Sequence, residues 1–382
     1  MTPSLTFAPE EYQGRLEALR EAMELHGLDA CVLTSEHNVA YFSGLCHPGF
    51  GGPEGMVVTR TDSVTISAVS SGGRAGRRGF GESLAYDDGQ RDDFWRLVAA
   101  AAGTGKAIGC EADHLTLMQS EKLNAFLKPR RGADIALAAM QQRMVKSDAE
   151  LGLIRALAEV ADLGARVLRN GVKVGAREID IAGAGLKAME AEIARLWPDD
   201  EYRGSHALLQ SGPNSDCVAG SVTSRRLKRG DVIGLTAAPM LGGYGAALKR
   251  TLFLGEPDPE GLRFCEAAIA AHVQGPALLK PGVTCGQIAD GLDAVLGSRQ
   301  TGPMRSGEFG GGMTHEPLLA FRADNDTALE IGMVIRLAPW LVVPPDQSGA
   351  GGYGAQDMFV ITEDGCEALT RFPLGPEFVV AD

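Results

Sequence analysis

The stretch GDVIGLTAAPMLGGYGAALKRTLFL, residues 230–254, carries the pattern that decides the fold of the second half of the chain. It belongs to a region, Leu208 to Leu254, of short apolar runs separated by Gly, Pro and Asn turns, which is typical of β-strands. Helical patterns follow over Pro259 to Lys280 and Cys285 to Leu296, and strand-like runs return in MVIRLAPWLVV and DMFVITEDG. Because helices and strands are segregated here, we predict an α+β domain with a largely antiparallel sheet.

A long helix opens this domain. Ser147 and Glu150 have the spacing of a capping box, and apolar residues continue at helical intervals until Asn170 and Gly171 offer a stop. A second helical pattern, VGAREIDIAGAGLKAMEAEIARL, comes before the strands.

The residues before this helix show a different pattern, in which strand-like and helical runs alternate. Helical periodicity covers Glu10 to His26, Asp92 to Ala102 and Leu115 to Leu127, and the strand-like runs are ACVLT, GMVVT, VTISA and KAIGCEA. Alternation of this kind predicts a small α/β domain. We therefore expect two domains, residues 1–142 and 143–382.

Composition narrows the classes of function. The chain has 382 residues, 45% of them hydrophobic, and no run approaches the ~18 apolar residues of a membrane helix. A net charge of −13 would repel a phosphate backbone, so a nucleic acid is not expected as a partner. The seven cysteines never occur in C-x-x-C spacing, which disfavours a disulfide framework and a zinc knuckle. The first residues lack a signal-peptide pattern, so we expect a cytoplasmic protein.

Several short motifs, spread in order along nearly the whole chain, resemble one known family. They are LTSEHNVAYFSG, DDGQRDDFW, QQRMVKSDAE, LQSGPNS, KRTLFLG, GAGGY and FPLGPE. The chain resembles the pita-bread group, which contains methionine aminopeptidase, aminopeptidase P, prolidase and the metal-independent creatinase, and within it the creatinases. The resemblance implies a small α/β domain of creatinase type followed by a pita-bread domain with a curved antiparallel sheet.

The peptidases of this family use two aspartates, a histidine and two glutamates to hold two metal ions. Four of the five positions fall here on Thr236, Ala247, Ala338 and Gln356, and the segment expected to hold the histidine, GPMRSGEFGGGM, contains none. Divalent ions need several carboxylate or imidazole ligands. We therefore predict no metal and no other cofactor.

The resemblance to creatinase also implies a site that this chain has changed. The histidine base falls on Ala219, and the glutamate expected to face a guanidinium falls on Lys249, which reverses the charge. One arginine expected to hold the carboxylate of creatine falls on Gly52 and the other near His315. Creatine is therefore not the expected substrate.

Other residues in these segments are candidates for a rebuilt site. Lys249 is predicted to act as an anion anchor or as a base with a lowered pKa, and His315, beside Glu316, as a general base. The alternative for each is an ordinary structural role on a strand or in a turn. The predicted substrate-binding residues are Glu54, His206, Asp216, Cys217, Thr236 and Gln356.

Two functions remain open from the sequence. The first is a metal-independent enzyme that acts on a small polar substrate by hydrolysis or elimination at a C–N bond. The second is a catalytically degenerate binding module, or a pseudoenzyme partner of an active paralogue. The resemblance further implies a homodimer with the site near the subunit interface, where Glu54 would come from the neighbouring subunit.

Overall fold

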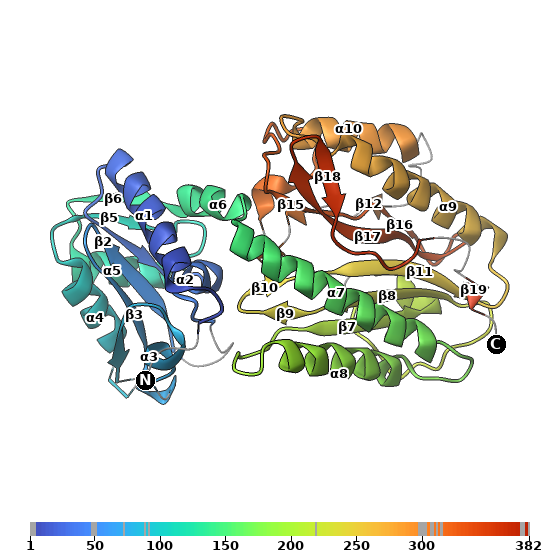
Figure 1. Cartoon of the computed structure of the whole chain (residues 1–382), viewed down its shortest axis with the longest axis horizontal. Coiled ribbons are helices and arrows are strands. Elements are labelled where there is room, and N and C mark those ends of the chain that lie inside the picture. Colours follow the sequence, from blue (N-terminus) through green and yellow to red (C-terminus); the bar gives the residue numbers. More distant parts are fainter. Residues whose placement is uncertain are drawn as a thin grey trace. The chain divides into compact units, whose positions relative to one another are not determined.

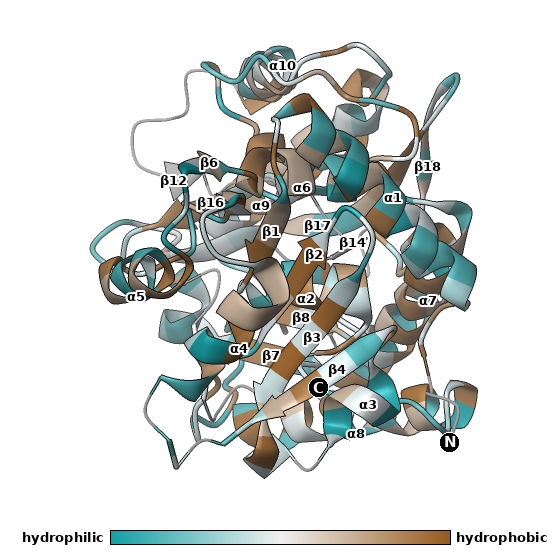
Figure 2. Ribbon diagram, turned by 90° about the vertical axis from the view of Figure 1, so that its left-hand side faces the viewer, coloured by the Kyte–Doolittle hydropathy of each residue, from teal (hydrophilic) through white to brown (hydrophobic). Residues whose placement is uncertain are grey.

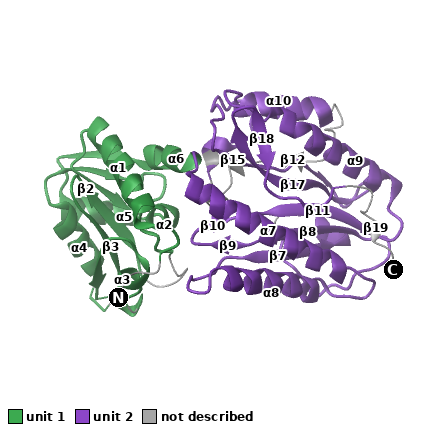
Figure 3. Ribbon diagram, in the orientation of Figure 1, with its two compact units in different colours: residues 1–144 green, residues 145–382 purple. Residues whose placement is uncertain are grey.

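The chain divides into two compact units. The computed structural model describes residues 5–46, 52–71, 73–87, 89–90, 92–217, 220–296, 304–305, 309–310, 312–313, 316–374 and 379–380. Unit 1 is Met1–Met144 and unit 2 is Val145–Asp382 (Figures 1 and 3). The predicted two-domain α+β architecture is confirmed. None of the described helices is long and apolar enough to cross a membrane.

Unit 1 is built around a mixed six-stranded sheet in the order β4-β3-β2-β1-β5-β6. Its strands are β1 Ala30–Leu33, β2 Gly55–Thr59, β3 Ser63–Ala68, β4 Glu82–Tyr86, β5 Ala107–Cys110 and β6 Arg131–Asp134. Its helices are α1 Pro9–Leu25, α2 Glu36–Ser43, α3 Arg74–Arg78, α4 Asp93–Ala102, α5 Leu117–Leu127 and α6 Ala136–Met144. Apolar segments run along β1, β2 and β3 (Figure 2), where buried residues such as Val32, Val57 and Ile66 form the core.

A buried carboxylate organises the polar interior of unit 1. Glu111, which follows β5, is 1% exposed and accepts hydrogen bonds from the backbone N–H of Ser35 at 2.9 Å and from the amide of Asn38 at 2.5 Å. The Ser35 hydroxyl also donates to it. These bonds hold the N-cap of α2 in place, and the Ser35 hydroxyl in turn accepts from the backbone N–H of Asn38 in the first turn.

The described part of unit 2 contains four long helices and a large, mainly antiparallel sheet (Figure 1). The helices are α7 Asp148–Gly171, α8 Glu178–Leu196, α9 Pro259–Gln274 and α10 Cys285–Leu296. The central strands are β7 His206–Ser211, β8 Val232–Ala238, β11 Leu248–Leu254, β17 Gly351–Thr362, β15 Val334–Leu337 and β16 Trp340–Val343. The shorter strands are β9 Met240–Leu241, β10 Tyr244–Gly245, β12 Met304–Arg305, β13 Phe309–Gly310, β14 Gly312–Met313, β18 Gly365–Ala368 and β19 Val379–Val380.

The predicted start of the second domain forms as its sequence indicates. The Ser147 hydroxyl accepts from the backbone N–H of Glu150 at 3.2 Å, and the Glu150 carboxylate accepts from the backbone N–H of Ser147 at 2.9 Å. Glu150 also accepts a hydrogen bond from the Tyr244 hydroxyl at 2.6 Å, which ties the helix start to β10. One expected helix is shorter than predicted: α9 ends at Gln274 instead of Lys280, because Pro276 has no N–H to continue it.

The Gly-rich segment before Asp357, which the sequence does not mark as a strand, is the first half of β17. Glycine usually weakens a strand, but here other backbones approach too closely for a side chain. A Cβ on Gly352 would collide with the carbonyl oxygen of Ser215, and one on Gly354 with that of Pro339. The GAGGY motif is therefore a packing requirement at the point where β17 passes the loop after β7.

Helices cover one face of the central sheet. Gly164 of α7 packs against Ala237 of β8, Gly185 of α8 against Ala207 of β7, and His272 of α9 bonds to Asp357 of β17. Since side chains alternate along a strand, residues one position away on the same strands point to the opposite face. Thr236 and Gln356 are two such residues, and the candidate site is built on their face.

Candidate functional site

Three of the predicted site residues form one row across adjacent strands. Lys249 of β11 lies directly opposite Thr236 of β8 on one side and Gln356 of β17 on the other. Paired residues of antiparallel strands point to the same face, with Cβ atoms about 4.5–5.5 Å apart. Thr236, Lys249 and Gln356 are therefore neighbours on the face of the sheet that α7, α8 and α9 do not cover.

Lys249 is a buried amine packed on an aromatic ring. The residue is 3% exposed, and its Nζ lies 3.9 Å from the centroid of the Trp340 ring. Burial lowers the pKa of Lys249 to about 7, against an opposing effect of the Cys217 side chain. The indole face favours the charged form, which limits the loss of protonation. Near neutral pH this amine therefore exists in both its basic and its cationic form.

The two neighbours of Lys249 supply neutral polar groups. The Thr236 hydroxyl is buried and makes no hydrogen bond to the described part of the chain. The Gln356 side-chain amide donates to the carbonyl oxygen of Ala247 at 3.2 Å, and its side-chain carbonyl oxygen is an acceptor that this bond does not use. These groups could bind a polar substrate beside the amine without competing for its proton.

Asp216 and Cys217 lie in a loop that hydrogen bonds within unit 2 fix on both sides. The loop follows β7 as a 3₁₀ turn over Gly212–Asp216. Glu178 accepts hydrogen bonds from Ser211 at 2.6 Å and Thr223 at 2.7 Å, which fixes the segments on both sides. The Gln210 amide donates to the Cys217 carbonyl oxygen at 2.7 Å. Cys217 is exposed, and its side chain acts on the pKa of Lys249 by raising it against the effect of burial.

The other predicted residues are not gathered around Lys249 in the described structure. His206 is exposed at the start of β7, where its Nδ1 lies 3.4 Å from the carbonyl oxygen of Gly204. Glu54 belongs to unit 1, where it is 5% exposed and lines a pocket of about 360 Å³ with Gly52 and His114. His315 and the base position Ala219 lie outside the described residues.

Gly52, where the resemblance to creatinase implies an arginine, has no room for a side chain. A Cβ on Gly52 would collide with the hydroxyl of Tyr86, so any larger side chain requires that ring to move. The Tyr86 ring is itself held edge-on against Phe94, with ring centroids 5.6 Å apart. The Tyr86 ring therefore occupies the space that a side chain at position 52 would need.

The described ligand positions do not fit a pair of divalent metal ions. Ala247 and Ala338 have no donor atom in their side chains, and Thr236 and Gln356 are neutral. Lys249 places a basic amine between Thr236 and Gln356. Within the described ranges, no group of three His, Cys, Asp or Glu side chains has a metal-binding arrangement.

Arg336, which also belongs to this face, was not predicted from the sequence. It lies on β15 opposite Met358, which is two residues from Gln356 on β17, so its side chain belongs to the same face as Lys249. Burial lowers the pKa of Arg336, and the nearby Glu316 opposes this effect. The signal was present in MVIRLAPWLVV, where one arginine interrupts an apolar strand.

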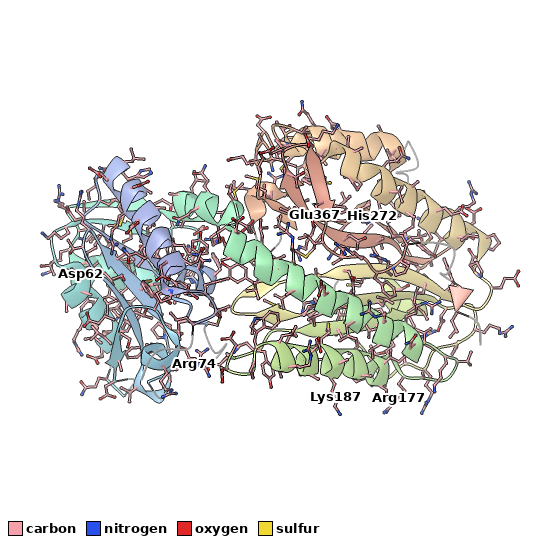
Figure 4. The ribbon with its side chains drawn as sticks, viewed as in Figure 1. Asp62, Arg74, Arg177, Lys187, His272 and Glu367 are labelled. Atoms are coloured by element: carbon pink, nitrogen blue, oxygen red, sulfur yellow. The ribbon has the colours of Figure 1, made fainter. Side chains whose placement is uncertain are left out.

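An ionic cluster of Arg250, Asp357 and His272 lies on the opposite, helix-covered face of the sheet. Arg250, the residue after Lys249, binds Asp357 at 2.9 Å and the carbonyl oxygens of Lys249 and Gln356 at 2.8 and 2.9 Å. His272 of α9 (Figure 4) bonds to Asp357 through Nε2 at 2.8 Å. Arg250 therefore clamps the backbone of the two strands that carry Lys249 and Gln356.

Comparison with known proteins places this architecture in a family. Residues 152–363 match the model of metallopeptidase family M24, and residues 15–145 match the creatinase/prolidase N-terminal domain. The chain is 37% identical to a creatinase of Bacillus sp. (strain B-0618) over 383 residues, which covers 97% of this chain and 93% of that protein. It is 25% identical over 372 residues to an uncharacterized peptidase of Bacillus subtilis, covering 94% of this chain and 98% of the relative.

Solved structures agree on the fold. A prolidase from Pyrococcus horikoshii has a TM-score of 0.81 at 19% identity, covering 94% of this chain and 99% of that one. The dipeptidase PepE from Mycobacterium ulcerans also has a TM-score of 0.81, at 22% identity, with 98% and 100% covered. Together with the two domain matches and the similarity to a creatinase over nearly the whole length, these results show that the chain belongs to the M24 family, as a creatinase-like member with the pita-bread fold.

Proposed function

We propose that the chain is a metal-independent, creatinase-like enzyme that cleaves a C–N bond in a small polar substrate, by hydrolysis or elimination. The observation that carries this proposal is the state of Lys249, a buried amine with a pKa of about 7 between two neutral polar side chains. A general base works best when its pKa lies near the working pH. Membership of the M24 family, whose similar members include a creatinase, supports chemistry at C–N bonds.

The residues of this face suit a simple proton-transfer sequence. In hydrolysis, neutral Lys249 takes a proton from water while the water oxygen attacks the carbon of the C–N bond. The displaced electron pair moves to the carbonyl or imino heteroatom, toward which the Thr236 hydroxyl is suited to donate. When the C–N bond breaks, the Lys249 ammonium returns the proton to the leaving nitrogen. In elimination, the same amine removes a proton from carbon and the leaving nitrogen departs with the bonding electrons.

The site opposes a cationic guanidinium. The positive charge of Lys249 would repel a guanidinium. Its neighbours Thr236 and Gln356 offer no carboxylate to neutralise that charge. The structure therefore supports a neutral amide, urea or imino group at the reacting end of the substrate rather than the guanidinium of creatine.

Release of ammonia or amine from a panel of small amides, ureas and amidines tests the proposal. The wild type should turn over at least one class, with a rate that rises through pH 7 as Lys249 loses its proton. Lys249→Met should lower the rate by about 10² or more, the usual contribution of a general base. Lys187→Met is the matched control, since Lys187 is exposed on α8 (Figure 4) and should leave the rate unchanged. Equal turnover by wild type and Lys249→Met would reject the catalytic role.

The same panel separates an enzyme from the binding-module alternative. A binding module would show thermal stabilisation by ligands without turnover at any pH. We further propose a cytoplasmic homodimer in which unit 1 of one copy, with Glu54, approaches the Lys249 face of the other. Light scattering that reports a monomer at micromolar concentration would reject the dimer.

A further inference from the structure

A cavity of about 430 Å³ lies on the helix-covered face of the sheet in unit 2, where α9, β17 and β18 meet (Figure 1). Arg250 and Asp357 line it, and each follows a residue of the Lys249 row by one position, so their side chains point to the opposite face. Exposed side chains, among them Val273 and Arg371, also line it. The cavity is therefore open to solvent and separate from the candidate site.

Apolar side chains form most of the cavity wall. Phe359 and Phe372 are buried there, and Pro276 and Leu374 also line it. The volume lies within the range of small-molecule sites, about 300–1,000 Å³, and such sites combine apolar walls with a few polar groups that fix the ligand. The polar groups that line this cavity therefore decide which ligand it fits.

Arg250 has no donor left for a ligand. Its Nε donates to the carbonyl oxygen of Pro373 at 3.1 Å, and its Nη1 donates to two backbone carbonyl oxygens at 2.8 and 2.9 Å. Its Nη2 donates to Asp357 at 2.9 Å and to the carbonyl oxygen of Phe372. These five bonds use all five N–H groups of the guanidinium. The ion pair of Arg250 and Asp357 has no net charge.

His272 has one ring nitrogen that is not used in this way. The residue is 2% exposed, and its Nε2 bonds to Asp357 at 2.8 Å, whereas its buried Nδ1 makes no hydrogen bond to the residues that the structure describes. Burial raises the pKa of Asp357, but the hydrogen bond from His272 and the charge of Arg250 outweigh it, so the carboxyl is ionised. Because a carboxylate only accepts, Nε2 carries the proton, and Nδ1 of the neutral ring is an acceptor.

We propose that this cavity binds an uncharged small molecule with an apolar body, whose single hydroxyl donates a hydrogen bond to Nδ1 of His272. A buried acceptor without a partner is destabilising, so a ligand that donates to it gains affinity. An anion offers no donor, and a cation would lie beside Arg250 and Arg371. Phenols and alicyclic alcohols represent the expected class. The inference goes beyond the proposed function, because the site lies on the other face of the sheet and its test requires no turnover.

Selective labelling of histidine with ¹⁵N reads this site directly by NMR. Titrations at pH 8, above the usual titration range of histidine, use phenol and cyclohexanol, each paired with its methyl ether, and benzoate as the anion. The His272 signals are assigned with His272→Gln, which can still donate to Asp357 but has no ring nitrogen. Val273→Trp narrows the cavity, and Val174→Trp, at an exposed valine that does not line it, is the matched control. Melting temperatures establish that each variant is folded.

In the free wild type, Nδ1 of His272 should have the chemical shift of an unprotonated nitrogen. At least one alcohol should move this signal to lower frequency, as acceptance of a hydrogen bond does, and should bind about 5-fold or more tighter than its ether. His272→Gln should bind alcohol and ether alike. Val273→Trp should bind both more weakly than wild type, and Val174→Trp should match wild type.

Four results would overturn the proposal. The first is a proton on Nδ1 in the free protein, and the second is no binding of either alcohol at about 10 mM. The third is an affinity for benzoate or for the ethers that equals or exceeds that for the alcohols. The fourth is an alcohol that binds without moving the Nδ1 signal, or that binds Val273→Trp as tightly as wild type, since either places the ligand elsewhere. All four are measured on wild type or on Val273→Trp, so they stand even if His272→Gln does not fold.

Discussion

Lys249 and Trp340 form the contact around which the candidate site is arranged: the lysine nitrogen lies 3.9 Å from the centroid of the indole ring. Lys249 comes from β11 and Trp340 from β16, and β17 lies between these two strands in the sheet. The Trp340 side chain therefore reaches across β17 and covers Lys249, two strands away. An amine desolvated by this packing is expected to lose its proton more easily than a lysine in water.

Replacing Lys249 should stabilise the protein in a manner that depends on pH. Its pKa of about 7 in the folded protein lies below the ordinary 10.5, so the unfolded chain binds more protons between these values. Stability of the wild type should therefore rise by about 1.4 kcal/mol per pH unit in this window. Lys249→Met should be the more stable protein at pH 6, and the difference should shrink as the pH approaches 10. Urea unfolding at pH 6, 8 and 9.5 measures it, and a constant difference across the series would show that the amine is not desolvated.

Replacing Asp357 in the ionic cluster should lower the stability of the folded protein. Burial alone would raise the pKa of this carboxyl, but the hydrogen bond from His272 and the charge of Arg250 hold it below its usual value. A lowered pKa contributes stability above the ordinary value of 3.8, and this contribution is lost as the pH falls further. Asp357→Asn should cost about 3–5 kcal/mol at pH 7, because it leaves Arg250 buried without a counter-charge. The variant should also lose less stability than wild type below pH 4. Asp324→Asn, at an exposed pair with Arg322, serves as the control and should change little.

Gly352 should tolerate no side chain. Gly352→Ala would bring a Cβ onto the Ser215 carbonyl and within 2.9 Å of the Trp340 indole nitrogen. The substitution should cost roughly 2 kcal/mol or more through overpacking. Gly152→Ala is the matched control, since a Cβ there meets nothing within 4 Å and alanine favours a helix. Thermal unfolding should show a lower melting temperature for the first variant and an equal or higher one for the second; equal values for both would contradict the packing seen in β17.

Metal removal should leave the protein unchanged. Thr236, Ala247, Ala338 and Gln356 provide no anionic ligand, so a chelator should alter neither the melting temperature nor any turnover. Elemental analysis of the purified protein checks this directly. A stoichiometric transition metal, lost together with stability on chelation, would contradict it.

The local features of the fold were predictable because their signals are local. The capping box of Ser147 and Glu150 uses residues three positions apart, and both of its hydrogen bonds form. The strand that contains Gly352 was not predictable in the same way. Its glycines are required by the backbones of Ser215 and Pro339, which are distant in sequence.

The candidate site was predictable only in part. The family motifs placed Thr236, Lys249 and Gln356 in corresponding segments, and the strand register makes them neighbours. Arg336 carries no motif, and its position beside them follows from the pairing of β15 with β17. The ionic cluster joins Arg250, His272 and Asp357, which no short pattern could connect.

The pKa of Lys249 is the measurement that tests the central claim most directly. Selective labelling of lysine with ¹³C at Cε, assigned by comparison with Lys249→Met, would follow its titration by NMR between pH 5 and 11. A midpoint near 7 is expected for Lys249. A midpoint at the ordinary value of 10.5 would show a solvated ammonium, and Lys249 could then not serve as the base of this site.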